Sequence, residues 1–140
     1  MTLEGPTLIA EIGATYARLA FTRDGLNLIK QKSYKVKAFN SIESLFNNYF
    51  KEADTEAYKA ILGVAAPILG DEVNFINIQL KFSQGELRKK IFKEKLIVLN
   101  DLELQAHGIR SLTKRDLKLI GEQKKPLKGS KILVSPGTGL

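Results

Sequence analysis

The first forty residues alternate short apolar runs with turn-forming residues. β-Favouring residues occupy Thr7–Ile12, Tyr16–Thr22 and Leu26–Val36, separated by Gly13 and by Arg23-Asp24-Gly25. Runs of this length joined by tight turns are typical of antiparallel strands. The pattern therefore predicts a three-stranded meander at the start of the chain.

The period of the apolar residues changes from strand-like to helical after residue 40. Ser41 is a good N-cap, and the apolar residues that follow recur every three or four positions, which predicts an amphipathic helix of about three turns. These residues are Ile42, Leu45, Phe46, Tyr49 and Phe50. Lys59–Ala65 then has the composition of a buried strand that Pro67 and Gly70 end. Val73–Leu80 is expected to be irregular and extended, and a hairpin is expected between this strand and the second helix.

Capping residues predict where the next two helices begin. Ser83 with Glu86 three positions later matches a capping box, so a second helix should begin near Ser83. Leu96–Leu99 is a short apolar strand that leads into Asn100-Asp101, either of which can cap a helix ending near Gly108. The chain thus continues with strand and helix in alternation.

The last predicted strand, Lys131–Val134, leads into the glycine-rich segment Pro136-Gly137-Thr138-Gly139, and the lysine-rich stretch Gly121–Gly129 is expected to be a mobile loop. With right-handed crossovers, this order of elements predicts an α/β fold. We expect a mixed five-stranded sheet that opens with an antiparallel meander and carries helices on both faces. Because no linker or repeat interrupts the pattern, residues 1–140 should form one domain.

Composition narrows the class of protein. The 140 residues are 44% apolar and 26% charged, which is typical of a soluble globular protein, and the absence of cysteine rules out disulfides. The longest weakly polar stretch, residues 60–70, is too short and too broken by glycine and proline to cross a membrane. Glu4 and Pro6 stand where a signal peptide needs basic and then apolar residues, so a cytoplasmic protein is expected.

The net charge of +7 belongs to the second half of the chain. Residues 81–140 hold 14 basic and 6 acidic side chains, whereas residues 1–80 hold 8 and 9. The two basic clusters, Lys81–Lys95 and Arg110–Lys131, lack the interleaved aromatic residues of a base-stacking surface. A solvated basic face is favoured, an anionic small-molecule partner comes second, and nucleic acid is least favoured.

Three places bring polar residues to the end of a strand or to a tight turn, where open α/β sheets bind ligands. The turn Glu11–Thr15 combines a carboxylate with Gly13, which lets the backbone approach a ligand, and Thr15, which adds a hydroxyl and an N–H for phosphate oxygens. Asn100-Asp101 can hold one hydroxyl of a ligand and accept a proton from another. Pro136–Gly139 can form an anion-binding nest.

Each of these places also has a simpler interpretation. Small residues are common in hairpin turns, asparagine and aspartate are preferred helix caps, and a glycine-rich end can be unstructured. His107 is the only histidine, so a histidine-rich metal site is impossible, and a histidine on the surface of a helix is the favoured interpretation.

Taken together, these segments resemble bacterial glucokinases in five blocks in the same order. Leu8–Ala20 resembles the first phosphate motif, an apolar strand followed by Asp and Gly-Gly-Thr-Asn-Ala-Arg-Leu-Ala. Gly63–Asp71 is similar to the Ala-Gly-Pro-x-x-Gly segment, and Asn77 stands where the family has Thr-Asn. Val98–Leu102 resembles Ile-Asn-Asp-Phe, and Ser135–Leu140 resembles the second phosphate motif, Gly-x-Gly-Thr-Gly-Leu-Gly.

The resemblance implies an actin-like, ribonuclease-H-like ATPase fold and a kinase of carbohydrate metabolism. Such an enzyme transfers the γ-phosphoryl group of ATP, with Mg²⁺, to the 6-hydroxyl of glucose in the first step of glycolysis. The resemblance implies that Asp101 is the general base and that Asn100 and Asn77 bind the sugar. It assigns the phosphates and Mg²⁺ to Glu11, Gly13, Ala14, Thr15, Gly137, Thr138 and Gly139, with no protein metal site proper, and a homodimer is possible for the full-length protein.

The chain departs from the family pattern in the first motif and in its extent. Glu11 replaces Asp, Ala14 replaces the second Gly, and Tyr16 replaces Asn. If the turn binds phosphate, restoring Asp and Gly is expected to tighten Mg-ATP binding. The resemblance covers only the small N-terminal domain of the family, so the larger C-terminal domain is expected to be absent here and the isolated chain inactive. The alternative is a truncated or non-catalytic protein of the same fold with a weakened phosphate motif.

Overall fold

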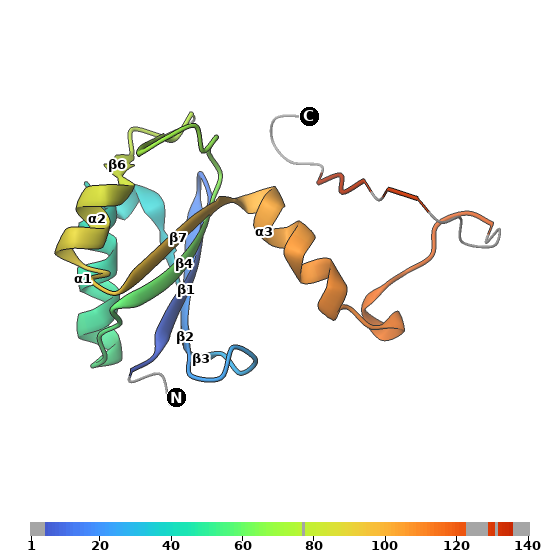
Figure 1. The fold of residues 1–140 in the computed structure, drawn as a ribbon, viewed down its shortest axis with the longest axis horizontal. Helices are drawn as coiled ribbons and strands as arrows, with labels where there is room; N and C mark the ends of the chain where they lie inside the picture. The colour runs from blue at the N-terminus through green and yellow to red at the C-terminus, as the bar shows by residue number, and fades with distance from the viewer. Residues whose placement is uncertain (1–4, 77, 123–128, 131, 136–140) are drawn as a thin grey trace.

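The computed structural model describes residues 5–76, 78–122, 129–130 and 132–135 (Figure 1). Its strands are β1 (Thr7–Ile12), β2 (Tyr16–Thr22), β3 (Ile29–Lys35), β4 (Lys59–Val64), β5 (Glu72–Asn74), β6 (Lys81–Ser83) and β7 (Lys95–Asn100). Its helices are α1 (Ile42–Ala53), α2 (Gln84–Lys90) and α3 (Asp101–Gly108), with the 3₁₀ turns η1 (Val36–Ala38), η2 (Ile109–Ser111) and η3 (Lys114–Asp116).

Five strands form one mixed sheet in the order β3-β2-β1-β4-β7. The β1–β2 and β2–β3 pairs are antiparallel, whereas β4 pairs in parallel with both β1 and β7. The predicted mixed sheet with an opening meander is therefore confirmed. The reason is local: tight turns return the first strands side by side, while the later strands are separated by helices long enough to bring the chain back in parallel.

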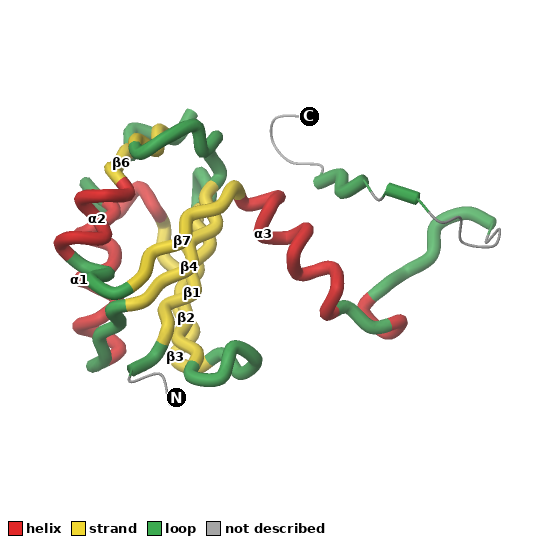
Figure 2. Tube along the Cα trace, viewed as in Figure 1, coloured by secondary structure: helices red, strands yellow, loops and turns green. Residues whose placement is uncertain are grey.

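The main core lies between the sheet and the two helices α1 and α2, which cover the same face (Figures 1 and 2). In β1 every second residue points into it, as a strand period of two requires, whereas the edge strand β3 contributes only the half-buried Tyr34. Aromatic rings join the layers: Phe21 of β2 lies 4.9 Å from Tyr49 of α1, and Phe46 of α1 lies 5.2 Å from Phe92 after α2. The aromatic stripe that the sequence places on α1 is thus core packing.

The opposite face of the sheet is covered much less. Ile9, Glu11 and Ile61 on this face are only half-buried. α3 begins on this side, where Leu104 packs against Gly63 of β4, and then leaves the sheet (Figure 1). No residue of α3 is buried. Helices therefore lie on both sides of the sheet as predicted, but only the side of α1 and α2 has a core. Within the described residues, no helix is long and apolar enough to cross a membrane.

The predicted caps explain where the helices begin. The Ser41 hydroxyl accepts the Ser44 N–H at 3.1 Å and the Ser44 hydroxyl accepts the Ser41 N–H, a reciprocal capping box that starts α1. Ser83 caps α2 by accepting the Glu86 N–H, which is one half of the predicted capping box; in the described residues the Glu86 carboxylate does not accept the Ser83 N–H in return. The Glu86 carboxylate accepts a hydrogen bond from Lys90 one turn later, at 2.7 Å, a pair that also supports the helix.

Two predicted segments differ from the structure in detail. The third strand begins at Ile29 rather than Leu26, because the Asp24 carboxylate accepts the N–H groups of Leu26 and Asn27 and folds them into a loop. These hydrogen bonds hold the pKa of Asp24 well below its usual range. The start of the segment Val73–Leu80, predicted as irregular, is regular: it belongs to β5, which pairs with β6 in the hairpin expected before the second helix.

The prediction of a last strand at Lys131–Val134 is wrong for its described residues, 132–134. Ile132–Val134 belongs to no strand, and Ile132 and Val134 are exposed. A β-favouring run becomes a strand only when a neighbour pairs with its backbone, and the described part of the chain offers it none. Lys131 and most of the predicted Gly121–Gly129 loop lie outside the described residues.

Candidate functional site

The carboxyl ends of the three parallel strands share one edge of the sheet. In register, Ile12 of β1 lies beside Val64 of β4, and Val64 lies beside Asn100 of β7. Neighbouring strands are about 4.8 Å apart, so the turn after β1 and the start of α3 lie within about 10 Å of each other. Two of the three candidate places are thereby brought to one edge, the usual ligand side of such sheets.

The β1–β2 turn is tight, and its glycine is needed for close approach. The Gly13 N–H donates to the Tyr16 carbonyl oxygen at 2.9 Å. A Cβ on Gly13 would lie 3.3 Å from the same oxygen. Ala14 is not strained, because the non-glycine residues with positive φ in the described chain are Lys30 and Asp54. The replacement of the family's second Gly by Ala14 therefore fits this turn.

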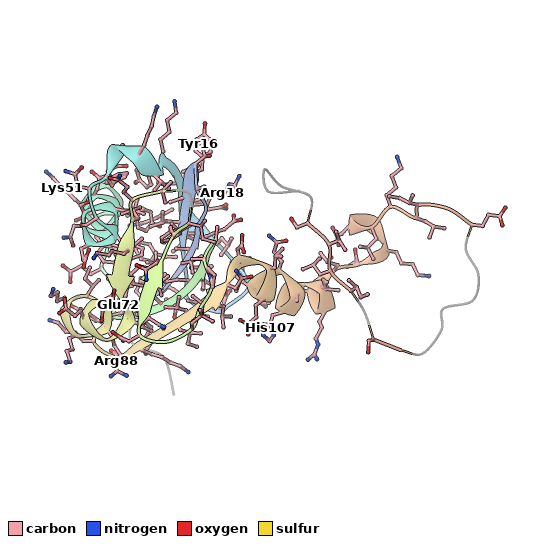
Figure 3. All side chains as sticks on the ribbon, turned by 90° about the horizontal axis from the view of Figure 1, so that it is seen from above. Tyr16, Arg18, Lys51, Glu72, Arg88 and His107 are labelled. Carbon is pink, nitrogen blue, oxygen red and sulfur yellow. The ribbon has the colours of Figure 1, made fainter. Side chains whose placement is uncertain are left out.

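The turn also presents hydrogen-bond donors to the outside. In the described part of the chain, the N–H groups of Ala14 and Thr15 donate to no protein acceptor. The Thr15 side chain is exposed, and Tyr16 is 45% exposed at the tip of the sheet (Figure 3). Two free N–H groups and a hydroxyl in one turn suit the oxygens of an anion.

Glu11 is engaged in an ion pair. Its carboxylate accepts a hydrogen bond from the Arg18 guanidinium at 2.8 Å, and the two residues are direct partners across β1 and β2. Both lie on the poorly covered face of the sheet, where the pair is largely exposed to solvent. Arg18 was not singled out from the sequence, although the two opposite charges lie at equal distances from the centre of the turn, which in a hairpin places them opposite each other.

The residues at this edge of the sheet suit a magnesium ion bound together with the phosphates of a substrate better than one bound by protein side chains alone. Among the described residues, no three or more histidine, cysteine or acidic side chains cluster as a metal site. Mg²⁺ commonly uses one or two carboxylates together with substrate phosphates and water. Glu11 lies three residues before Ala14, the first residue of the turn whose N–H has no protein acceptor in the described chain, and would take that part while still paired with Arg18.

Asn100 is the N-cap of α3, as the simpler interpretation predicted, and Asp101 is the first residue of the helix. The Asn100 Oδ1 and one Asp101 carboxylate oxygen accept the same N–H, that of Leu102, at 3.0 and 2.9 Å. The Asn100 amide also donates to the Ala66 carbonyl at 3.2 Å, which ties α3 to the segment after β4. The second Asp101 carboxylate oxygen makes no hydrogen bond within the described residues, and the side chain is half-buried at the edge of the sheet.

Asp71 is a structural residue that sequence reasoning did not single out. Its carboxylate accepts hydrogen bonds from the Ser83 hydroxyl and from the Gly85 N–H, the latter at 2.8 Å. These bonds lower the pKa of Asp71. These hydrogen bonds join the β5–β6 hairpin to the start of α2, so the role of Asp71 is structural.

The remaining candidates divide into two groups. Asn77, Gly137, Thr138 and Gly139 lie outside the described residues, so the sugar and second-phosphate assignments to them stay predictions. His107 is exposed on α3, well apart from Tyr16 and Arg18 in Figure 3, in agreement with the prediction of a surface histidine.

Comparisons with known proteins extend this resemblance. A sequence model of the family described as Glucokinase matches residues 8–140. The chain is 32% identical over 136 residues to a glucokinase of Neisseria meningitidis, covering 96% of this chain and 42% of the relative. It is 36% identical over 107 residues to a glucokinase of Photorhabdus laumondii, covering 76% of this chain and 33% of the relative.

Solved structures give the same picture of the fold. A glucokinase from an Antarctic psychrotroph superposes with a TM-score of 0.72 at 25% identity, over 79% of this chain and 37% of that one. A glucokinase from Balamuthia mandrillaris, solved in complex with glucose, superposes with a TM-score of 0.60 at 24% identity, over 76% and 32%. The chain spans 42% and 33% of the lengths of these two curated relatives. With the family match over almost the whole sequence, this chain belongs to the glucokinase family.

Proposed function

We propose that this chain is the N-terminal part of an ATP-dependent kinase that phosphorylates the 6-hydroxyl of glucose. The observation that carries the proposal is the shared edge of the sheet, where a turn with free N–H groups lies about two strand spacings from the Asn100-Asp101 pair. Phosphoryl transfer depends on positioning and charge stabilisation more than on covalent chemistry, and these two features supply such positioning.

Asp101 is the proposed general base. The Leu102 N–H holds one of its carboxylate oxygens, which orients the group and leaves the second oxygen to accept the proton of the sugar hydroxyl. Asn100 and Asn77 are proposed to bind other sugar hydroxyls. The Asn100 amide, fixed by Ala66 and Leu102, is a preorganised group for this purpose.

The phosphates of ATP are proposed to bind Gly13, Ala14 and Thr15 on one side and Gly137, Thr138 and Gly139 on the other. Mg²⁺, when bound, neutralises charge on the phosphates. Glu11 would hold a water molecule of the hydrated ion. Because the Glu11 carboxylate already accepts a hydrogen bond from Arg18, it would bind this water and the guanidinium at the same time.

The complete protein is proposed to contain a further domain, because this chain spans 42% of the length of its Neisseria meningitidis relative. That domain would supply further contacts to glucose and to adenosine. A cytoplasmic enzyme and a homodimer of the full-length protein are part of the same proposal. The glucose-bound Balamuthia mandrillaris structure supports the choice of glucose as substrate.

The alternative function is that of a non-catalytic relative, and one observation favours it. The motif carboxylate, already changed to Glu11, is neutralised by Arg18 rather than held free beside the phosphate turn. A protein that no longer uses Mg-ATP would retain the same fold and the same ion pair.

A coupled assay of glucose phosphorylation separates the two functions, using the protein at the full length that its gene encodes. We expect glucose-dependent consumption of ATP. Full-length protein that folds but binds neither Mg-ATP nor glucose in calorimetry would contradict the proposal and support the non-catalytic alternative.

A further inference from the structure

A hollow of about 330 Å³ lies beside the β1–β2 turn on the side of β3. Its lining residues come from two places that are apart in the sequence: the turn with the first residue of β2, and the end of β3 with η1. They are Ala14, Thr15, Tyr16, Lys35 and Lys37. Neither lysine belongs to the motif by which the chain resembles its family.

The backbone fixes both lysines beside the turn. Tyr16 and Lys35 are direct partners in the β2–β3 pair, and the Val36 N–H donates to the Thr15 carbonyl oxygen at 3.0 Å. Val36 is buried, so Lys35 and Lys37 leave the chain on either side of an anchored residue and both are exposed. The two ammonium groups are therefore tethered to the same hollow, although their side chains stay free to adjust.

The hollow carries positive charge without a matching carboxylate. None of its lining residues is acidic, and the ion pairs found in the described residues include neither Lys35 nor Lys37. Lys32, on the same strand, instead approaches Glu52 at 3.7 Å. The N–H groups of Ala14 and Thr15, which have no protein acceptor in the described chain, and the Thr15 hydroxyl add hydrogen-bond donors.

We propose that Lys35 and Lys37, with the N–H groups of the β1–β2 turn, form a binding site for a phosphate group. Ammonium groups bind phosphate as mobile point charges, and successive backbone N–H groups direct its oxygens. Lysines on an edge strand also discourage sheet pairing, but that role needs neither a shared hollow nor free donors beside it. The site deepens the proposed function, because it enlarges the phosphate turn on which that function rests.

The phosphate group can come from a nucleotide or from a free phosphorylated ligand. Titrating the 140-residue protein with inorganic phosphate, pyrophosphate, a sugar phosphate and Mg-ATP at constant ionic strength, and following the backbone amides by NMR, distinguishes these sources. We expect pyrophosphate to shift the amides of Ala14–Tyr16 and Lys35–Lys37. A response to Mg-ATP and pyrophosphate alone indicates a nucleotide, and an equal response to the sugar phosphate indicates a free ligand.

Charge-removing variants test the lysines directly. Lys35→Gln with Lys37→Gln should weaken pyrophosphate binding at least about 10-fold, as expected for the loss of two charged contacts. The matched control, Lys51→Gln with Lys89→Gln, removes the same charge from exposed positions on α1 and α2 and should change the affinity less than about 2-fold. Lys35→Arg with Lys37→Arg should retain binding, because the charge is kept.

Two results would overturn the site: no amide shifts in these two segments with any probe, or equal losses in the lysine variant and in its control. Its failure is separable from that of the proposed kinase. Full-length protein that phosphorylates glucose, while no probe shifts the amides of these two segments, refutes the site alone. Pyrophosphate binding that the lysine variant abolishes, in a protein without kinase activity, supports the site and refutes the kinase.

Discussion

At the scale of single residues, the altered first motif is accommodated rather than strained. Ala14 has an ordinary backbone conformation, whereas Gly13 is the position where a side chain would press on the Tyr16 carbonyl. Glu11 reaches Arg18 across the two strands. The surroundings of Glu11 and Ala14 have therefore adjusted to the residues present, which changes what restoration of the family motif should do.

Glu11→Asp combined with Ala14→Gly should lower the melting temperature without tightening Mg-ATP binding. The shorter carboxylate loses reach toward Arg18, and glycine at an unstrained position reduces stability by about 0.5–1 kcal/mol. Calorimetry with Mg-ATP and thermal unfolding of both proteins measure the two effects. Tighter binding after the double change would mean that the present motif is a weakened phosphate site.

Asp101→Asn in the full-length protein should lower kcat at least about 100-fold while leaving glucose affinity nearly unchanged, because it removes a proton acceptor and keeps the shape of the side chain. Asn100→Ala should act mainly on glucose affinity, with an added loss of about 1 kcal/mol in stability from the lost cap. Steady-state kinetics together with glucose titration separate these effects. An unchanged kcat in Asp101→Asn would mean that Asp101 is not the general base and serves only the start of helix α3.

At the scale of elements, α3 is attached to the sheet by a small contact at its first turn. Leu104 lies directly over Gly63, in the space that a Cβ on Gly63 would occupy. Of the other residues of the helix, only Asp101 is half-buried, and the rest are exposed. Because Asp101 is the first residue of α3, this contact helps to set the position of the proposed base.

Gly63→Ala should therefore release α3 while leaving the sheet intact. Leu104 must move, but it is a flexible side chain at the surface, so the free energy of unfolding should change by less than about 1 kcal/mol, while the amides of residues 102–108 exchange faster. Gly70→Ala is the matched control, because a Cβ there meets no atom within 4 Å. Unchanged exchange in Gly63→Ala would show that Leu104 does not hold α3.

The contact between α1 and β3 predicts a dependence of stability on alkaline pH. The Tyr49 hydroxyl donates to the Lys30 carbonyl at 2.9 Å, and burial raises the pKa of Tyr49 to about 12. A raised pKa means that this contribution is complete below the unfolded pKa of about 10 and is lost as pH rises toward 12.

The Tyr49→Phe variant isolates this contribution, since other titrating groups are common to both proteins. Near pH 8 the variant should be less stable by about 0.5–1.5 kcal/mol, the usual value of a lost hydrogen bond. Urea unfolding at rising pH should show this difference shrinking between pH 10 and 12. A constant difference would mean that Tyr49 does not ionise in the folded protein in this range.

At the scale of the whole molecule, the described residues present one side of the proposed kinase site. Residues 1–140 alone should show no measurable phosphorylation of glucose, because exclusion of water and the remaining ligands require a second domain closing over the sugar. The coupled assay on the purified 140-residue protein, with full-length protein as the positive control, tests this. Turnover by the short chain would show that the site is complete without such closure.

The sequence by itself determined the meander, helix α1, the alternation of later strands and helices, and hence the mixed sheet. These features follow from interactions between residues close along the chain: apolar periodicity, tight turns, and caps such as Ser41 and Ser83. The order of the family blocks identified Asp101 and the first phosphate turn as candidates for the same reason, since each motif is contiguous.

Only the tertiary structure decided which of these segments meet. It placed the β1–β2 turn on the same edge as Asn100-Asp101, left Ile132–Val134 without a neighbouring strand, and brought Lys35 and Lys37 to the side of the turn. It also showed that Ala14 needs no positive φ. Pairing and packing between distant segments depend on partners that no local pattern contains, and the same β-favouring run becomes a strand or remains unpaired according to whether such a partner is present.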